Sequence, residues 1–318
     1  MAGRKDKRTK VVVIGTGMVG STFAYSLMIN GVASEIVLID ANEERAASEV
    51  ADLNHGLPFV RPAVIRTGEY ADCADADVIV ITAGAAQRPG ETRLDLVGRN
   101  VKIFEDIIPR IVASGTHGVL VIASNPVDVM TYVTYKISGF PANQVIGSGT
   151  VLDTSRFRYL LSRHCGVDPS NVHAYIIGEH GDSEVAVWSL ANIAGLRFSE
   201  YCPICGHDCG PLRKEDIFEQ VRTAAYPIIK AKGATYYAIG LALVQIVETI
   251  LRDEHSVLTV SSLLQGEYGL ENVCLSLPSL VNRHGVAKKL LISLNEKEEE
   301  GLRNSARVLQ EVIKAVGY

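Results

Sequence analysis

One histidine of this chain has a setting that suits proton transfer. His180 lies in a turn between Gly178 and Gly181, directly after the apolar, strand-like run that starts at Tyr175. An imidazole titrates near neutral pH, so it can donate a proton in one reaction direction and accept it in the other. A solvated histidine in a hairpin gives the same pattern, because glycine is common in turns. The charged residues elsewhere in the sequence decide between these interpretations.

An acid and an arginine three residues apart open an expected helix over 152–165. Asp153 stands near the start of this helix, where an acid can also serve as a simple cap. Arg156 follows on nearly the same helix face. Its planar guanidinium suits a two-point grip on a carboxylate, and the alternative is a surface ion pair. The two residues supply charges of the kind that a small anionic substrate needs.

A second arginine ends a polar segment, Gly84–Leu94, that contains a proline and two glycines. The segment follows an expected strand over 78–82, so it belongs at the carboxyl edge of a sheet, where ligands of such folds bind. We expect it to close as a lid. Closure brings Arg93 to a substrate carbonyl in a site cleared of water.

A glycine-rich turn, Gly15–Gly20, follows the first expected strand and precedes a helix that ends at Gly31. Three glycines allow a tight turn, close approach to a pyrophosphate and close packing of helix on strand. Asp40 stands 20 residues after Gly20, at the end of the next strand, where it can bind ribose hydroxyls and repel a 2′-phosphate. The order of these features predicts an NAD site rather than an NADP site.

The elements that carry these residues form two patterns. In the first half, short β-branched runs alternate with amphipathic helices, which predicts a doubly wound parallel sheet, a Rossmann domain, over residues 1–150. The second half, 151–318, mixes helices and strands as an α+β domain that binds substrate. Strands are expected at 11–14, 36–39, 63–66, 78–82 and 119–122, then near 171–177, 183–188, 257–263 and 273–284. Helices are expected at 21–30, 152–165, about 212–231, 234–252 and 295–316.

Composition limits the classes of partner. The 318 residues are 47% hydrophobic and 21% charged with net charge −5, which argues against nucleic acid and anionic membranes as main partners. No apolar run is long enough to span a membrane, and the polar N-terminus lacks the core of a secretion signal, so we expect a cytoplasmic protein. Cys73, Cys165 and Cys274 are predicted to be buried thiols.

Five segments together resemble the lactate/malate dehydrogenase superfamily, and within it the NAD-dependent L-lactate dehydrogenases. The segments are Gly15–Gly20, Gln87–Arg93, Ser124–Asp128, Gly147–Phe157 and Ile177–Ser183. By this resemblance His180 is the acid/base, Asp153 orients it, Arg156 binds the substrate carboxylate and Arg93 polarises the carbonyl. Asn125, Thr235 and Gln87 complete the substrate site. The cofactor residues are then Gly15, Gly17, Met18, Val19, Gly20, Asp40, Asn125 and Ile239.

The loop residue Gln87 bears on the choice of substrate. The malate branch of the superfamily usually carries arginine at the matching position, where it pairs with a second carboxylate, and a neutral amide cannot do so. Gln87 therefore favours pyruvate and L-lactate, with malate and oxaloacetate as the alternative. The adjacent Arg88 would take that position if the loop register shifts by one residue.

Two further residues match positions that bind fructose 1,6-bisphosphate in bacterial members of this family. They are Arg158 and His173, and both are also compatible with an ordinary surface. The resemblance implies an allosteric site between subunits of a homotetramer, where the effector raises the affinity for pyruvate.

The segment Tyr201–Cys209 departs from the family pattern. Cys202, Cys205, His207 and Cys209 allow a zinc site, a redox-sensitive cysteine pair or an innocuous loop, and hydride transfer needs no metal. An NAD-dependent glycosidase and a non-catalytic NAD sensor share the nucleotide-binding half. The glycosidase needs metal ligands that the sequence lacks, and the sensor gives no reason for His180 and its charged partners.

Overall fold

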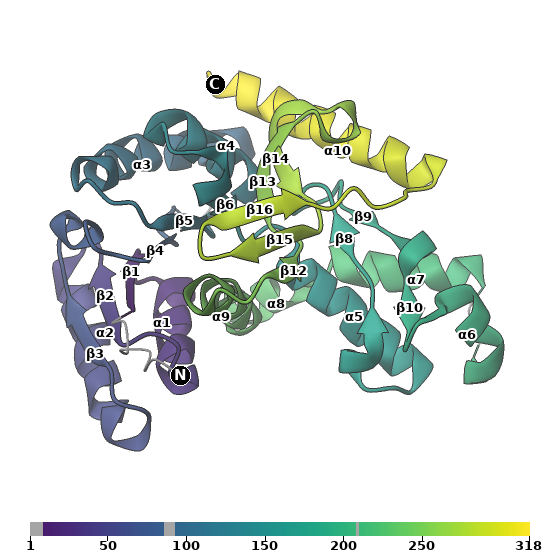
Figure 1. Cartoon of the computed structure of the whole chain (residues 1–318), viewed down its shortest axis with the longest axis horizontal. Helices are drawn as coiled ribbons and strands as arrows, with labels where there is room; N and C mark the ends of the chain where they lie inside the picture. The colour runs from purple at the N-terminus through teal and green to yellow at the C-terminus, as the bar shows by residue number, and fades with distance from the viewer. Residues whose placement is uncertain (1–8, 86–92, 208–209) are drawn as a thin grey trace, which may run out of the picture.

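An eight-stranded sheet organises most of the chain, in the order β14-β13-β6-β5-β4-β1-β2-β3 (Figure 1). The computed structural model describes residues 9–85, 93–207 and 210–318. The six strands that come first in the chain, β1–β6, are parallel. Their spatial order is that of a Rossmann sheet, which confirms the predicted fold class. They are β1 (Lys10–Ile14), β2 (Glu35–Ile39), β3 (Val64–Thr67), β4 (Val78–Ile81), β5 (Val119–Ile122) and β6 (Val145–Gly147).

The two remaining strands of the sheet come from the second half of the chain. The hairpin β13 (Ser261–Gln265) and β14 (Glu271–Ser276) continues the sheet in antiparallel sense, and Ser261 pairs with Gly147 of β6. An uncovered β6 would present unpaired backbone groups to water, and the hairpin covers that edge. The sheet is therefore mixed, which the sequence did not indicate.

Alternating residues of the central strands serve two separate cores. Val12 and Ile14 of β1 join a core on one face of the sheet, whereas Val11 and Val13 join a core on the other. The same alternation runs through β2, β4 and β5. Strands buried on both faces read as continuous apolar runs, and this explains why the sequence indicated them well.

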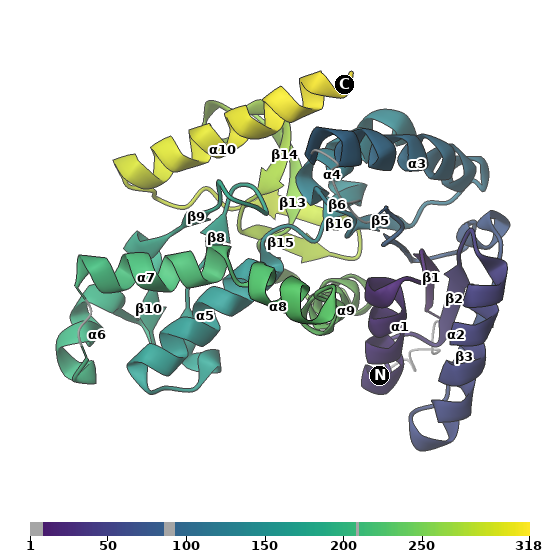
Figure 2. The ribbon, with the colours of Figure 1, turned by 180° about the vertical axis from the view of Figure 1, so that it is seen from behind.

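Helices cover both faces. The first core is completed by α3, α4 and α10, and the second by α1, α2 and α9. The view from behind shows α1 and α9 side by side and α10 along the edge that carries β14 (Figure 2). Within the described ranges no helix has the length and apolarity needed to span a bilayer. The bounds are α1 (Met18–Asn30), α2 (Glu43–Gly56), α3 (Arg93–Ala113), α4 (Val127–Ser138), α9 (Tyr237–Arg252) and α10 (Glu296–Ala315).

The smaller body after β6 has its own core, in which Phe157 of α5 packs edge-on against Trp188. Its helices are α5 (Val151–Cys165), α6 (Phe198–Cys205), α7 (Pro211–Arg222) and α8 (Ala225–Lys232). Its short strands are β7 (Val172–His173), β8 (Ile176–Ile177), β9 (Val185–Ala186), β10 (Asn192–Ile193) and β11 (Leu196–Arg197). The strands β7, β10 and β11 form one small sheet and β8 and β9 another. A further small sheet, made of β12 (Ser256–Leu258), β15 (Ser279–Asn282) and β16 (Gly285–Lys289), lies beside α9.

Four expected elements of the second half are divided in the structure. The helix expected at 212–231 breaks at Thr223, so Pro227, which lacks an N–H, falls in the first turn of α8 rather than inside a long helix. The strand expected at 273–284 divides at Pro278, which has no ladder donor, into β14 and β15. The runs at 171–177 and 257–263 likewise each supply strands to two different sheets.

Candidate active site

The acid/base candidate and its predicted partners meet in space. His180 follows β8 after a turn in which Gly178 has φ +87°, a conformation that favours glycine. The ring atom His180 Nδ1 lies 2.5 Å from Asp153 Oδ2, and Arg156 Nη1 donates to Asp153 Oδ1 over 2.8 Å. Asp153 is thus shared between an imidazole and a guanidinium, as its place at the start of α5 allows.

Burial and charge make this cluster favour the imidazolium. The Asp153 side chain is 3% exposed and that of His180 is 24% exposed. Burial acts against the charged ring, but the carboxylates of Asp153 and Asp128 outweigh it and raise the pKa of His180 to about 9. For Asp153, His180 and Arg156 overcome burial and lower the pKa of the carboxyl. A protonated ring beside an ionised acid is the state that can give a proton to a developing alkoxide.

Arg156 also lines a cavity of about 650 Å³ between α5 and α8. Thr235, in the loop between α8 and α9, lines the same cavity, so these two predicted substrate residues lie together. The guanidinium side chain is 17% exposed, which leaves part of it open to an incoming carboxylate.

Asn125 follows β5 and precedes a cis peptide bond to Pro126. Its carbonyl oxygen accepts a 2.7 Å hydrogen bond from Asn100 Nδ2, and Asn100 Oδ1 accepts the backbone N–H of Ala85 over 2.8 Å. The buried amide of Asn100 therefore ties Asn125 to the start of the predicted loop. Gln87 lies outside the described residues, and Arg93 is described only as the first residue of α3.

The glycine-rich turn fits a dinucleotide. A Cβ on Gly15 would come within 2.5 Å of Ala83 N, and one on Gly20 within 1.9 Å of Gly15 O, so both positions require glycine. A Cβ on Gly17 would meet nothing within 4 Å, which leaves space for a ligand beside the start of α1. The first turn of α1, with Met18 and Val19, has no acidic residue and no side-chain cap, so its N–H groups suit a pyrophosphate.

Asp40 stands directly after β2, beside the glycine turn. Its Oδ2 accepts the backbone N–H of Thr16 over 2.6 Å and the Thr16 hydroxyl over 2.9 Å, and its Oδ1 accepts the N–H of Asn42. Although burial acts in the opposite direction, these hydrogen bonds lower the pKa of Asp40 and keep it ionised. Ile239 of α9 packs against the core that contains α1. The carboxylate of Asp40 can accept hydrogen bonds from the ribose hydroxyls of NAD and would repel the 2′-phosphate of NADP.

Comparison with known proteins agrees with this arrangement. Residues 9–147 match the model of the lactate/malate dehydrogenase NAD-binding domain, and residues 150–317 match that of the α/β C-terminal domain. The chain belongs to the lactate/malate dehydrogenase family. The family resemblance and the NAD-binding half predicted from the motifs are therefore confirmed.

Relatives within the family cover nearly the whole chain. The L-lactate dehydrogenase of Acetivibrio thermocellus is 58% identical over 308 residues, 96% of this chain and 97% of that protein. L-lactate dehydrogenase 1 of Clostridium acetobutylicum is 52% identical, with 98% and 99% covered. The ligand-bound crystal structure of the minor L-lactate dehydrogenase of Enterococcus mundtii superposes with TM-score 0.94 at 44% identity, covering 97% of this chain and 98% of that one.

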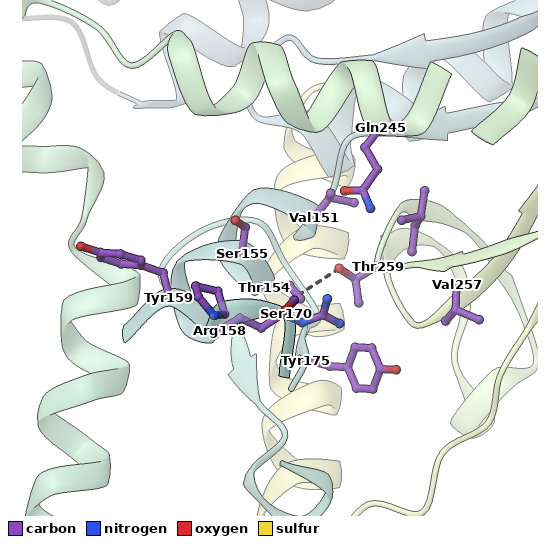
Figure 3. Close-up of a pocket in the computed structure, with 12 residues that line it drawn as sticks. Val151, Thr154, Ser155, Arg158, Tyr159, Ser170, Tyr175, Gln245, Val257 and Thr259 are labelled. Atoms are coloured by element: carbon purple, nitrogen blue, oxygen red, sulfur yellow. Dashed lines mark hydrogen bonds between the residues drawn. The ribbon is translucent and has the colours of Figure 1, made fainter. Parts of the chain in front are cut away.

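Of the two predicted regulatory residues, Arg158 lines a cavity that His173 does not line. Arg158 of α5 lines a cavity of about 380 Å³, where Figure 3 shows it among Thr154, Ser170 and Tyr175. Arg158 Nε donates to the carbonyl of Ala174 over 3.1 Å, and burial lowers its pKa. His173 of β7 is exposed and is not among the residues that line this cavity.

Of the buried acids near His180, Asp128 and Glu184 are two that received no role from the sequence. Asp128 belongs to the quoted segment Ser124–Asp128, and its Oδ2 accepts the backbone N–H of His180 over 2.7 Å. Glu184 follows the quoted segment that ends at Ser183, and it is 6% exposed. The first could have been found in the motif, whereas nothing in the sequence indicates that a single glutamate directly before β9 is buried.

Glu184 offers a stability prediction. Burial raises its pKa to about 9, and the nearby charge of Asp153 adds to this. Since the unfolded glutamate ionises near its ordinary, lower pKa, the folded state holds a proton that the unfolded state releases, and stability falls as pH rises through that interval. We expect Glu184→Gln to remove this fall. Between pH 5 and pH 8 the free energy of unfolding of wild type should therefore drop by about 1–3 kcal/mol more than that of the variant. Urea unfolding at both pH values measures the difference.

The matched control is Glu215→Gln, which changes an exposed glutamate of α7. Parallel dependences on pH for wild type and Glu184→Gln would mean that Glu184 is ionised in the folded protein.

The prediction of three buried thiols is confirmed. Cys73, Cys165 and Cys274 are buried free thiols. In the departing segment Cys205 forms no disulfide, Cys202 is disulfide-bonded, and Cys209 lies outside the described residues. No cluster of three potential metal ligands occurs in the described part of the chain, so the metal interpretation gains no support there.

Proposed function

We propose that this chain catalyses reversible hydride transfer between NADH and pyruvate, giving L-lactate and NAD. The observation that carries the proposal is the cluster in which Asp153 binds both the His180 ring and Arg156. The near full-length similarity to bacterial L-lactate dehydrogenases supports the same reaction. Steady-state loss of NADH absorbance with pyruvate tests it, and no turnover would refute it.

Each site residue then has a defined task. His180 donates a proton to the carbonyl oxygen as hydride reaches the carbonyl carbon, and Asp153 stabilises the imidazolium and fixes which nitrogen faces the substrate. Arg156 holds the substrate carboxylate. NADH, when bound, supplies the hydride. The remaining roles are those of Arg93, which polarises the carbonyl, of Asn125, Thr235 and Gln87, which contact substrate, and of Gly15, Gly17, Met18, Val19, Gly20, Asp40, Asn125 and Ile239, which bind the cofactor.

We expect a preference for pyruvate over oxaloacetate, because Gln87 offers no charge to a second carboxylate. Gln87→Arg should raise kcat/KM for oxaloacetate relative to pyruvate by about 10²-fold or more, since an unpaired carboxylate in a closed site is costly. The measurement is kcat/KM for both substrates in wild type and variant. An oxaloacetate preference in wild type would favour malate dehydrogenase instead.

Activation by fructose 1,6-bisphosphate is the regulatory part of the proposal. Arg158 lines the cavity of Figure 3, where its Nε donates to the carbonyl of Ala174, and the rest of its guanidinium can bind a phosphate. His173 would approach the effector from the adjacent strand. We place this site between subunits of a homotetramer, where the effector favours one quaternary state.

Arg158→Gln should blunt this activation. Loss of one charge-assisted contact to phosphate is expected to raise the half-saturating concentration of fructose 1,6-bisphosphate by about tenfold or more. Pyruvate saturation curves with increasing effector measure it, and kcat at saturating pyruvate serves as the control. An effector that leaves the wild-type saturation curve unchanged would remove the proposal.

The remaining assignments complete the proposal. Residues 1–150 form the NAD-binding domain and 151–318 the substrate domain, and the ranges of the two family models support this division. A cytoplasmic location, with no nucleic-acid or membrane partner, stays a prediction.

A further inference from the structure

The turn that carries His180 is held by three successive backbone N–H groups, each bound to a different element. Gly178 N–H donates to the carbonyl of Ser276 in β14 over 2.9 Å, and Glu179 N–H donates to the hydroxyl of Ser305 in α10 over 2.6 Å. His180 N–H donates to Oδ2 of Asp128, at the start of α4, over 2.7 Å. Of these three acceptors, only Asp128 belongs to the Rossmann half.

The burial of the Asp128 carboxyl costs folding stability. It is 1% exposed, and its Oδ1 has no well-formed hydrogen bond among the described residues. Burial raises the pKa of Asp128 to about 7, although Ser261 and the N–H of His180 oppose the shift. The ionisable groups that face it are His180 and Glu179 from the turn and Cys274 from β14. A buried carboxyl with an unsatisfied oxygen costs free energy, which suggests that function retains it.

The position of Asp128 links two parts of the proposed site. Asn125, the proposed ligand of substrate and nicotinamide, stands three residues before it, across the cis peptide bond to Pro126. The same short segment therefore carries one substrate contact and the anchor of the proton donor. A shift of about 1 Å between such groups is enough to cost about 10²-fold in rate.

We propose that Asp128 is a positioning residue, whose Oδ2 fixes the His180 peptide against α4 and so sets the imidazole at the right distance from a substrate held by Asn125. The inference rests on the proposed function. It assigns Asp128 no contact with the reacting atoms.

Three substitutions separate position from charge. Asp128→Ala removes the acceptor and should lower kcat for pyruvate reduction by about 10–10²-fold. Asp128→Asn keeps an oxygen at the same reach, so it should recover most of that loss. Asp128→Glu keeps the charge but displaces the oxygen by one methylene, so it should remain impaired.

The readout is kcat with NADH and with its 4-deuterated form, together with NADH affinity and thermal stability. Misplacement of His180 slows the chemical step, so the isotope effect on kcat should rise in Asp128→Ala and Asp128→Glu while NADH affinity stays within about twofold. Thr131→Val, which changes a buried threonine one turn further along α4, should leave kcat and the isotope effect at wild-type values.

The comparison of Asn with Glu decides the inference even if the alanine variant does not fold. Asparagine more active than glutamate supports positioning, whereas glutamate at least as active as asparagine overturns it in favour of a charge effect. Wild-type turnover of pyruvate tests the proposed function separately, before any variant is compared.

Discussion

Replacing His180 with asparagine is expected to lower kcat for pyruvate reduction by about 10³-fold. Asparagine preserves much of the shape of the ring but cannot carry the proton that the reduced carbonyl oxygen requires, and general acid catalysis contributes about 10²–10⁴-fold. NADH consumption at saturating pyruvate measures the effect. NADH affinity should change little, because His180 is not one of the residues proposed to bind the cofactor.

His284→Asn is the matched control, since it changes an exposed histidine in the turn between β15 and β16. It should retain wild-type turnover. A His180→Asn enzyme that reduces pyruvate at more than about a tenth of the wild-type rate would end the assignment of His180 as proton donor.

The pH dependence gives the same assignment a second test. Pyruvate reduction needs the protonated ring, so kcat/KM for pyruvate should fall as pH rises through about 9. Lactate oxidation needs the neutral ring and should rise over the same interval. Because Asp153 is a main cause of the raised pKa, Asp153→Asn should move both profiles to lower pH.

Arg156→Lys is expected to have the second large effect, on substrate affinity. Lysine keeps a positive charge and can still pair with Asp153, but it cannot form two parallel hydrogen bonds to a carboxylate. We expect KM for pyruvate to rise by about 10²–10³-fold, the range that loss of a desolvated charge contact implies. Pyruvate saturation curves at fixed NADH measure it.

Arg163→Lys, at an exposed position of the same helix, is the control for a general effect of the substitution on α5. A KM within about threefold of wild type in Arg156→Lys would mean that another residue binds the carboxylate.

The sequence indicated the parallel core of the fold for a clear physical reason. Strands such as 36–39 and 119–122 are buried on both faces, so their residues are apolar without interruption. The hairpin β13–β14 could not be placed in the same way. Its pairing with β6 joins Ser261 to Gly147, and no local pattern specifies a partner so distant in the chain.

The site divides along a similar line. Asp153 and Arg156 share one helix, so their proximity follows from helical spacing, and the structure bears it out. The pairing of His180 with Asp153 came from family resemblance, because 27 residues separate them. The contact of Asp128 escaped prediction since it is made to a backbone N–H, which is present at nearly every residue and leaves no signature in the sequence.

The hairpin that completes the large sheet also bears on how the polypeptide can be dissected. A fragment that stops after β6 would carry every proposed cofactor residue except Ile239, yet it would leave the short edge strand β6 unpaired, and an unpaired edge strand can associate with other copies. The proposed division of binding roles near residue 150 is therefore not a division of the sheet, because strands from both halves of the chain build it. We therefore expect residues 1–147 alone to be less stable and less soluble than the whole chain.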